Sequence, residues 1–228
     1  MQPNAVFATI ASVRLLPVIV VQDANDTPPL AAALKAGGLK CAEITLRSAA
    51  AADAIRAIAD DPDMIVGAGT VLRASQLEEA VRAGARFIVT PGFSREVVQL
   101  AQEAAVPVFP GVATATEVQM ALDEGVDVLK FFPAEAMGGV ATLKALGGPF
   151  PMVRFIPTGG INLERLKSYL DVKSVLAVGG SWMVAPELLR DKRFDEVSRL
   201  AAEAATLVRA LTGPSATPAG SPAMTARP

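Results

Sequence analysis

The feature that most constrains the fold is a regular alternation of short apolar runs with longer helical stretches. Eight runs rich in β-branched and aromatic residues have the length of buried strands. They are Leu16–Val21, Cys41–Leu46, Ile65–Val71, Phe87–Pro91, Val106–Val112, Val128–Pro133, Val153–Thr158 and Ser174–Gly180. Alanine-rich stretches with helical spacing separate them, so the chain predicts a βα unit repeated eight times.

The spacing of these runs favours a closed barrel. Strands begin every 19 to 25 residues, which suits parallel strands joined by right-handed helical crossovers. The prediction is therefore an α/β fold of the (β/α)8 TIM-barrel type, with a doubly wound open sheet as the alternative. We expect an extra N-terminal helix over Asn4–Val13 to cover the bottom of the barrel. One domain should span residues 1–211, and the Gly-, Pro- and Ser-rich segment 212–228 should be a disordered tail.

Helix starts are marked by capping residues. Thr114 and Glu117 have the spacing of a capping box, and Ser94 and Asn162 precede helical stretches as N-caps do.

Composition narrows the possible chemistry. The 228 residues include no histidine, which excludes Ser-His and Cys-His nucleophiles and histidine-ligated metal sites. A net charge of −2 gives no broad electrostatic case for a nucleic acid or an anionic membrane as partner. No apolar run approaches the roughly 20 residues of a membrane span. Since the single cysteine, Cys41, fits a reducing compartment, we expect a cytoplasmic protein.

Polar and apolar residues alternate in the second strand. Strand period two places Cys41, Glu43 and Thr45 on one face, together with Arg47, and the intervening apolar residues on the other. Barrel strands pack their outer face on helices, so the acid, the hydroxyl and the guanidinium should point into the barrel or to its rim. A functional site is the favoured interpretation, and an internal Glu–Arg pair is the alternative.

A single lysine lies in the apolar sixth strand. Lys130 shares a face with Val128 and Phe132, while the other lysines occupy helical or loop stretches. Burial without a fixed counterion disfavours an ammonium ion and leaves the free amine that attacks a carbonyl carbon. The alternative is a structural ion pair between Lys130 and Glu43.

Glycine pairs follow the last two strands. Gly159-Gly160 precedes a helix, and Gly179-Gly180 precedes Ser181. In barrels these two loops often present backbone N–H groups to a phosphate, because glycine allows close approach. The sequence thus predicts a phosphate site there.

These residues resemble the 2-keto-3-deoxy-6-phosphogluconate (KDPG) aldolase family, which includes the 4-hydroxy-2-oxoglutarate (KHG) aldolases. The resemblance extends from Leu16 to the last helix. Its most specific segments are Glu43–Arg47, Val66–Val71, Thr90–Gly92, Phe109–Gly111, Leu129–Glu135, Pro157–Gly160 and Val178–Trp182.

The resemblance implies a class I aldolase that cleaves KDPG to pyruvate and glyceraldehyde 3-phosphate, with activity on KHG as a further expectation. Lys130 would be the Schiff-base lysine and Glu43 the proton shuttle. It also implies a homotrimer with no metal and no organic cofactor. The expected partners are the phosphorylated 2-keto-3-deoxy acid and pyruvate.

The resemblance also assigns a substrate-binding set. Arg47 and Thr70 would bind the pyruvyl carboxylate, and glycines with a serine would hold the phosphate. The whole set is Arg47, Thr70, Pro91, Phe132, Thr158, Gly159, Gly160, Gly180 and Ser181. Some members carry an arginine in the first strand where this chain has Val20, which places more weight on backbone donors.

Other functions remain open at this point. A different phosphate-binding barrel, such as a sugar-phosphate epimerase or a thiamin-phosphate synthase, would share the fold. A Mg²⁺ aldolase with carboxylate ligands is a second alternative. The third is an assembly subunit in which the barrel serves only as a scaffold.

Overall fold

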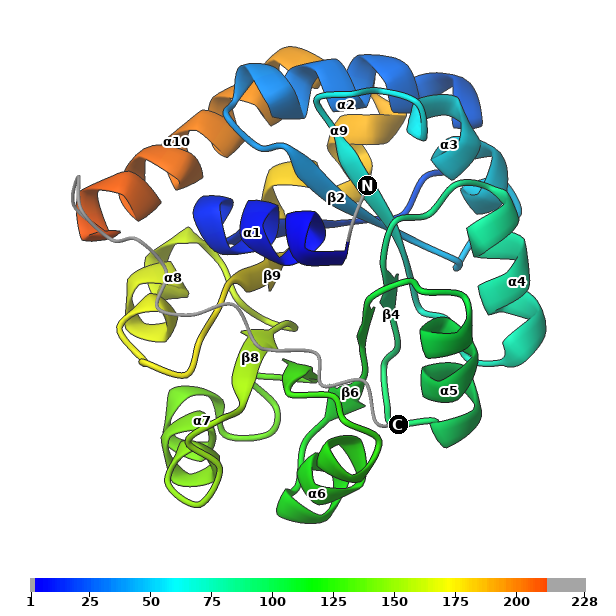
Figure 1. Ribbon diagram of the computed structural model, residues 1–228. Coiled ribbons are helices and arrows are strands. Elements are labelled where there is room, and N and C mark those ends of the chain that lie inside the picture. Colours follow the sequence, from blue (N-terminus) through cyan, green and yellow to red (C-terminus); the bar gives the residue numbers. More distant parts are fainter. Residues whose placement is uncertain (1–2, 213–228) are drawn as a thin grey trace.

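The computed structural model describes residues 3–212 and has an α/β fold in which helices surround parallel strands (Figure 1). The strands are β1 (Leu15–Ile19), β2 (Cys41–Thr45), β3 (Ile65–Gly69), β4 (Ile88–Val89), β5 (Val108–Phe109), β6 (Gly111–Val112), β7 (Val128–Phe131), β8 (Arg154–Pro157) and β9 (Val178–Gly180). The helices are α1 (Pro3–Val13), α2 (Thr27–Ala36), α3 (Ala51–Ile58), α4 (Ala74–Arg82), α5 (Arg95–Glu103), α6 (Ala115–Asp123), α7 (Gly139–Gly147), α8 (Leu163–Leu170), α9 (Pro186–Arg190) and α10 (Phe194–Thr212). Thr212 ends α10, and the rest of the expected tail lies outside the described residues.

The strands form two parallel sheets in the described part of the chain. One has six strands in the order β5-β4-β3-β2-β1-β9, and the other has three in the order β6-β7-β8. Isolated parallel bridges between Phe155 and Val175 and between Thr158 and Gly179 connect the β8 region to the β9 region. The parallel α/β architecture predicted from the sequence is therefore confirmed.

The expected single strand over Val106–Val112 was wrong. It is interrupted at Pro110, so that β5 pairs with β4 and β6 pairs with β7. Proline has no backbone N–H and cannot donate to a neighbouring strand, which explains the interruption. The hydrogen-bonded ladder consequently divides into two sheets at this point, where one continuous eight-stranded sheet was expected.

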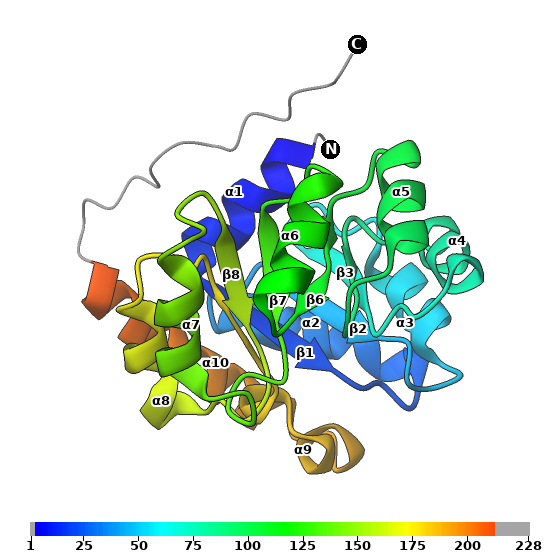
Figure 2. The same ribbon diagram turned by 90° about the horizontal axis from the view of Figure 1, so that it is seen from below.

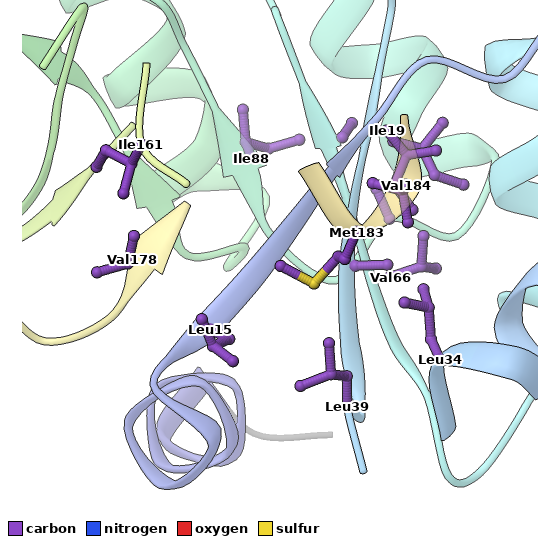
Figure 3. Packing of buried hydrophobic residues seen from close by; sticks show 14 of the residues in the cluster. Leu15, Ile19, Leu34, Leu39, Val66, Ile88, Ile161, Val178, Met183 and Val184 are labelled. Atoms are coloured by element: carbon purple, nitrogen blue, oxygen red, sulfur yellow. The ribbon is translucent and has the colours of Figure 1, made fainter. Parts of the chain in front are cut away.

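Two apolar clusters lie on the two faces of the strands. The outer one joins strands to helices and includes Leu15, Ile19, Val66 and Leu34 (Figure 3). The inner one joins side chains from both sheets with two residues of α1. Its buried members are Val6, Ile10, Leu16, Cys41, Ile65, Phe87, Val89, Phe109, Val128, Ile156 and Ala177.

Helix α1 covers the amino-terminal ends of the strands, as the sequence predicts. Val6 and Ile10 pack with Cys41 and Ile65, the first residues of β2 and β3. In Figure 2, α1 and α9 lie at opposite ends of the strands. The carboxyl ends, which hold the binding sites of parallel α/β folds, are therefore on the side of α9.

The predicted helix starts are confirmed. Ser94 accepts a hydrogen bond from the Val97 amide, and Asn162 accepts one from the Arg165 amide. Thr114 and Glu117 form a complete capping box. These caps satisfy amides that otherwise have no partner in the first helical turn.

The position of α1 generates a stability prediction. Ile10→Ala leaves a cavity at a fully buried position and should lower the free energy of unfolding by about 2 to 5 kcal/mol, measured by urea denaturation. Ser12→Ala, on the exposed face of the same helix, should change it by less than about 0.5 kcal/mol. Equal effects of the two substitutions would contradict the role of α1 as a cover of the inner cluster.

Candidate active site

A buried ion pair joins the two sheets. Lys130 lies in β7 and Glu43 in β2, and the lysine Nζ donates to the Glu43 Oε1 over 3.4 Å. Only 5% of Lys130 and 1% of Glu43 is exposed. This geometry fits both predictions made from the sequence. The pair can be a structural ion pair, or a nucleophile next to a group that carries protons.

Strand alternation explains why both charges point inward. Cys41 belongs to the inner cluster, whereas Ala42 and Ile44, which flank Glu43, belong to the outer cluster. In β7, Val128 is likewise an inner residue, and Lys130 follows it with strand period two. The inward direction predicted for both residues is therefore confirmed.

Gly69 provides the space that the Glu43 carboxyl group occupies. A Cβ atom at Gly69 would lie 2.0 Å from the Glu43 Oε1 and 2.6 Å from its Cδ. The other carboxyl oxygen, Oε2, is buried and has no hydrogen-bond partner in the described structure. An acceptor with an unused lone pair thus remains beside Lys130, where a water or a substrate hydroxyl can donate to it.

A tight contact places the loop after β4 beside the lysine strand. Gly111 pairs with Lys130, and a Cβ atom at Gly111 would lie 2.2 Å from the carbonyl oxygen of Pro91. The Thr90 hydroxyl donates to the Gly92 carbonyl and accepts from the Gly111 amide. Pro91 is therefore close to the backbone of the Lys130 strand, although it does not line the cavity described below.

A cavity of about 260 Å³ lies at the carboxyl ends of β1, β8 and β9. It gathers seven of the predicted binding residues, and five apolar side chains form its walls. The predicted residues are Arg47, Phe132, Thr158, Gly159, Gly160, Gly180 and Ser181. The apolar side chains are Val18, Val20, Ile161, Val184 and Pro186, and Gly179 completes the lining.

Phe132 connects this cavity to the ion pair. Its ring lines the cavity, and its centroid lies 5.1 Å from the Lys130 Nζ. Aromatic faces attract cations at this distance. Lys130 and Glu43 do not line the cavity and are more buried than Phe132.

Thr70 adopts a strained backbone conformation at the end of β3. Its φ of 56° lies in the left-handed region, which β-branched residues rarely adopt. Such strain is concentrated at functional sites. Thr70 directly follows Gly69, the residue against which the Glu43 carboxyl group packs, but it is not part of the cavity lining.

The glycine pairs allow the close packing that shapes the cavity. Gly159 and Gly160 have φ values of 107° and 78°, which disfavour any residue with a side chain. A Cβ atom at Gly179 would lie 2.1 Å from the Thr158 Oγ1, and one at Gly180 would lie 1.8 Å from the Trp182 ring. Both pairs are therefore required by the local structure.

The inward thiol does not compete with Lys130 as a nucleophile. Complete burial raises the pKa of Cys41 to about 12, and its Sγ donates to the Leu15 carbonyl oxygen over 3.3 Å. A neutral thiol is a poor nucleophile. Among residues 3–212, no three Asp, Glu, Cys or His side chains are grouped so that they could hold a metal ion.

Fold and site define a parallel α/β protein with a buried lysine–carboxylate pair and a cavity at the carboxyl ends of its strands, where enzymes of this architecture place their active sites. The family model of the KDPG and KHG aldolases matches residues 6–200, and the chain belongs to that family. The resemblance found in the sequence is therefore confirmed.

Curated and solved relatives agree with the family. The KHG/KDPG aldolase of Escherichia coli K12 is 48% identical over 191 residues, which are 83% of this chain and 90% of that protein. The KDPG aldolase of Legionella pneumophila, solved with pyruvate captured as a covalent carbinolamine, has a TM-score of 0.84 and 42% identity over 89% of this chain and 97% of its own. The enzyme of Zymomonas mobilis ZM4, solved with 3-phosphoglycerate, has a TM-score of 0.84 and 39% identity over 92% and 99% of the two chains.

Sequence reasoning missed several residues of this site. The sequence analysis includes Gly69 only within the Val66–Val71 segment of the resemblance, because its spatial neighbour Glu43 lies in another strand. Ile161, Val184 and Pro186 line the cavity without any sequence pattern that distinguishes them from core residues.

The contact between Gly69 and Glu43 generates a prediction. Gly69→Ala should lower the free energy of unfolding by about 1 to 3 kcal/mol through overpacking. Gly92→Ala, whose Cβ would meet nothing within 4 Å, should be nearly neutral. In a double-mutant cycle measured by urea denaturation, the cost of Gly69→Ala should shrink in a Glu43→Ala background. Additive costs would show that the Glu43 carboxyl group is not what excludes a side chain at position 69.

Proposed function

We propose that this chain is a class I aldolase that cleaves KDPG to pyruvate and glyceraldehyde 3-phosphate and also accepts KHG, giving pyruvate and glyoxylate. The observation that carries the proposal is the buried Lys130–Glu43 pair beside Phe132, which lines a cavity together with Arg47 and the two glycine pairs. The named activities of the relatives support it. The captured carbinolamine of the Legionella enzyme is the adduct that a lysine would form with pyruvate.

Imine formation begins at Lys130. Its Nζ attacks the C2 ketone of the substrate, and loss of water from the carbinolamine gives a protonated imine. Glu43, 3.4 Å from the Nζ, takes the proton that the ammonium must release and returns one to the departing hydroxyl. The apolar surroundings of β7 keep competing water away from these steps.

Carbon–carbon cleavage follows from the imine. The C4 hydroxyl loses its proton to Glu43, directly or through a water, and the C3–C4 bonding electrons move into the imine to give an enamine of pyruvate. Glu43 then delivers the proton to C3, and hydrolysis of the resulting imine releases pyruvate. The unpaired Oε2 of Glu43 is the atom free to make these transfers.

The remaining site residues bind and orient the substrate in this proposal. Arg47 and Thr70 hold the carboxylate next to the ketone, since a guanidinium binds a carboxylate through two parallel hydrogen bonds. Phe132, Thr158 and Pro91 shape the path between the lysine and the cavity. Amides of the two glycine pairs and the Ser181 hydroxyl hold the phosphate.

We also propose that the two sheets close into one (β/α)8 barrel and that the enzyme is a cytoplasmic homotrimer. The inner cluster, to which both sheets contribute, supports closure, as do the bridges from the β8 region to the β9 region. Family membership supports the trimer, and the single buried thiol fits a reducing compartment. No helix among residues 3–212 is long and apolar enough to span a membrane.

The identity of the nucleophile can be tested by trapping. Pyruvate with borohydride should reduce the imine to a stable secondary amine, and peptide mapping by mass spectrometry should place the adduct on Lys130. The adduct should form in the presence of EDTA, and Lys144→Met, which removes an exposed helical lysine, should label at the wild-type level. An adduct on Lys144, or labelling that EDTA abolishes, would contradict the assignment. A wild-type protein that forms no adduct would favour the scaffold alternative.

The role of Glu43 can be separated from that of Lys130. Glu43→Gln keeps the shape of the side chain but cannot carry a proton, so aldol cleavage and deuterium exchange into the methyl group of pyruvate should fall together by about 10²- to 10⁴-fold. Long incubation with pyruvate and borohydride should still label Lys130. Exchange at the wild-type rate would show that Glu43 is only a counterion.

A further inference from the structure

Three successive carbonyl groups of the turn that follows β8 each accept a hydrogen bond from a residue outside the cavity lining. The carbonyl oxygen of Thr158 accepts from the Ala134 amide over 2.8 Å, and that of Gly159 accepts from the Glu135 amide over 3.1 Å. The third carbonyl, at Gly160, accepts from the Arg165 guanidinium over 3.2 Å. Three successive peptide units are thus fixed by donors that do not line the cavity.

This pattern determines where the amides of the turn point. In a trans peptide unit the C=O and N–H groups point in opposite directions. Because the carbonyls of Thr158, Gly159 and Gly160 face donors outside the cavity lining, the amides of Gly159, Gly160 and Ile161 point away from those donors. Those same three residues line the cavity. Of the three carbonyl contacts, the one to Gly160 is the only one made by a side chain.

Arg165 belongs to a cluster with two other residues. Its Nε forms an ion pair with the Glu135 Oε2 over 3.1 Å, and the Tyr169 hydroxyl donates to the other oxygen of Glu135. Burial raises the pKa of Tyr169, and this hydrogen bond raises it further, so the hydroxyl stays a neutral donor. Both carboxyl oxygens of Glu135 are therefore occupied.

The turn also packs directly on this cluster. A Cβ atom at Gly160 would lie 2.8 Å from the Cβ and Cγ of Glu135. Glu135 thus supports the turn in three ways: its backbone amide binds Gly159, its side chain fills the space beside Gly160, and its carboxylate fixes Arg165. The side chains of Glu135 and Arg165 are not part of the cavity lining.

We propose that Arg165 and Glu135 are positioning residues that set the orientation of the Gly159-Gly160 turn and thereby determine selectivity for phosphorylated substrates. The proposal rests on the function proposed above and extends it to residues outside the cavity. Arg165 holds the Gly160 carbonyl away from the anion, and Glu135 holds Arg165 in place and prevents its charge from turning into the cavity.

The central variant is Arg165→Met, assayed with KDPG, with its unphosphorylated analogue and by pyruvate deuterium exchange. The KM for KDPG should rise about tenfold, the scale for losing one charge-assisted hydrogen bond. Turnover of the analogue and deuterium exchange should stay within about twofold. Arg165→Lys should restore part of the KM, because a lysine can reach one of the two partners but not both.

Lys167→Met is the matched control. Lys167 lies on the same helix and pairs with Asp171 over 2.7 Å, and it makes no contact with the turn in the described structure. The KM of the Lys167→Met variant should equal that of the wild type for both substrates. An equal rise in the control would assign the effect to helix α8 as a whole and overturn the proposal.

Glu135→Gln decides between positioning and direct binding. If Arg165 acts through the turn, loss of the carboxylate loosens the guanidinium, and the KM for KDPG should rise as in Arg165→Met. If Arg165 binds the phosphate itself, Glu135→Gln frees the charge of Arg165, and the KM for KDPG should stay constant or fall, which would overturn the proposal.

An Arg165→Met variant with lower turnover on both substrates and lower deuterium exchange would also overturn it. A wild type without cleavage or exchange would instead reject the proposed function.

Discussion

The burial of two opposite charges inside apolar strands is the constraint on which the rest of the structure depends. Lys130 and Glu43 lie on strands of different sheets, and each would be costly to bury without the other. Their pairing requires both strands to keep their inward register, because a shift of one residue in either strand would turn its charge onto the helices. It also requires Gly69, since any side chain there would displace the carboxyl group. The lysine–carboxylate pair therefore constrains the arrangement of the strands, whatever its part in the proposed chemistry.

The cavity at the carboxyl ends of the strands is lined mainly by glycine backbone and apolar side chains, with little contribution from charged side chains. Among the residues that the structure describes, Arg47 is the one charged residue in its lining, and much of the rest is glycine or apolar. Backbone amides have fixed directions and lose little entropy when they bind, but their orientation must be set from outside. The hydrogen bonds from Ala134, Glu135 and Arg165 supply that orientation. The order of this glycine-rich turn consequently depends on residues that do not line the cavity.

Much of this organisation was predictable from the sequence, because it is local. The inward faces of β2 and β7, the capping residues and the covering helix α1 all follow from the period of apolar residues or from one short motif. The features that were missed depend on contacts between distant segments. Nothing near Gly69 in the sequence reveals that Glu43 needs its space. Pro110 is a local signal that a strand can be interrupted, but it does not show that the two parts pair with different sheets. Thr70 was predicted as a site residue, but its positive φ was not.

The inner face of the strands is apolar at one end and carries charged and polar groups toward the other. The residues that stabilise the fold are therefore separate from the candidate site residues. At the amino ends, α1 and the inner cluster form a dry apolar layer. Lys130 and Glu43 come next, and the cavity follows at the carboxyl ends. A rigid apolar layer beneath the ion pair limits how far either charge can move, because close-packed interiors transmit strain and do not absorb it. The apolar layer thus lies beneath the Lys130–Glu43 pair, whose charges are 3.4 Å apart, and restricts the space into which either side chain can move.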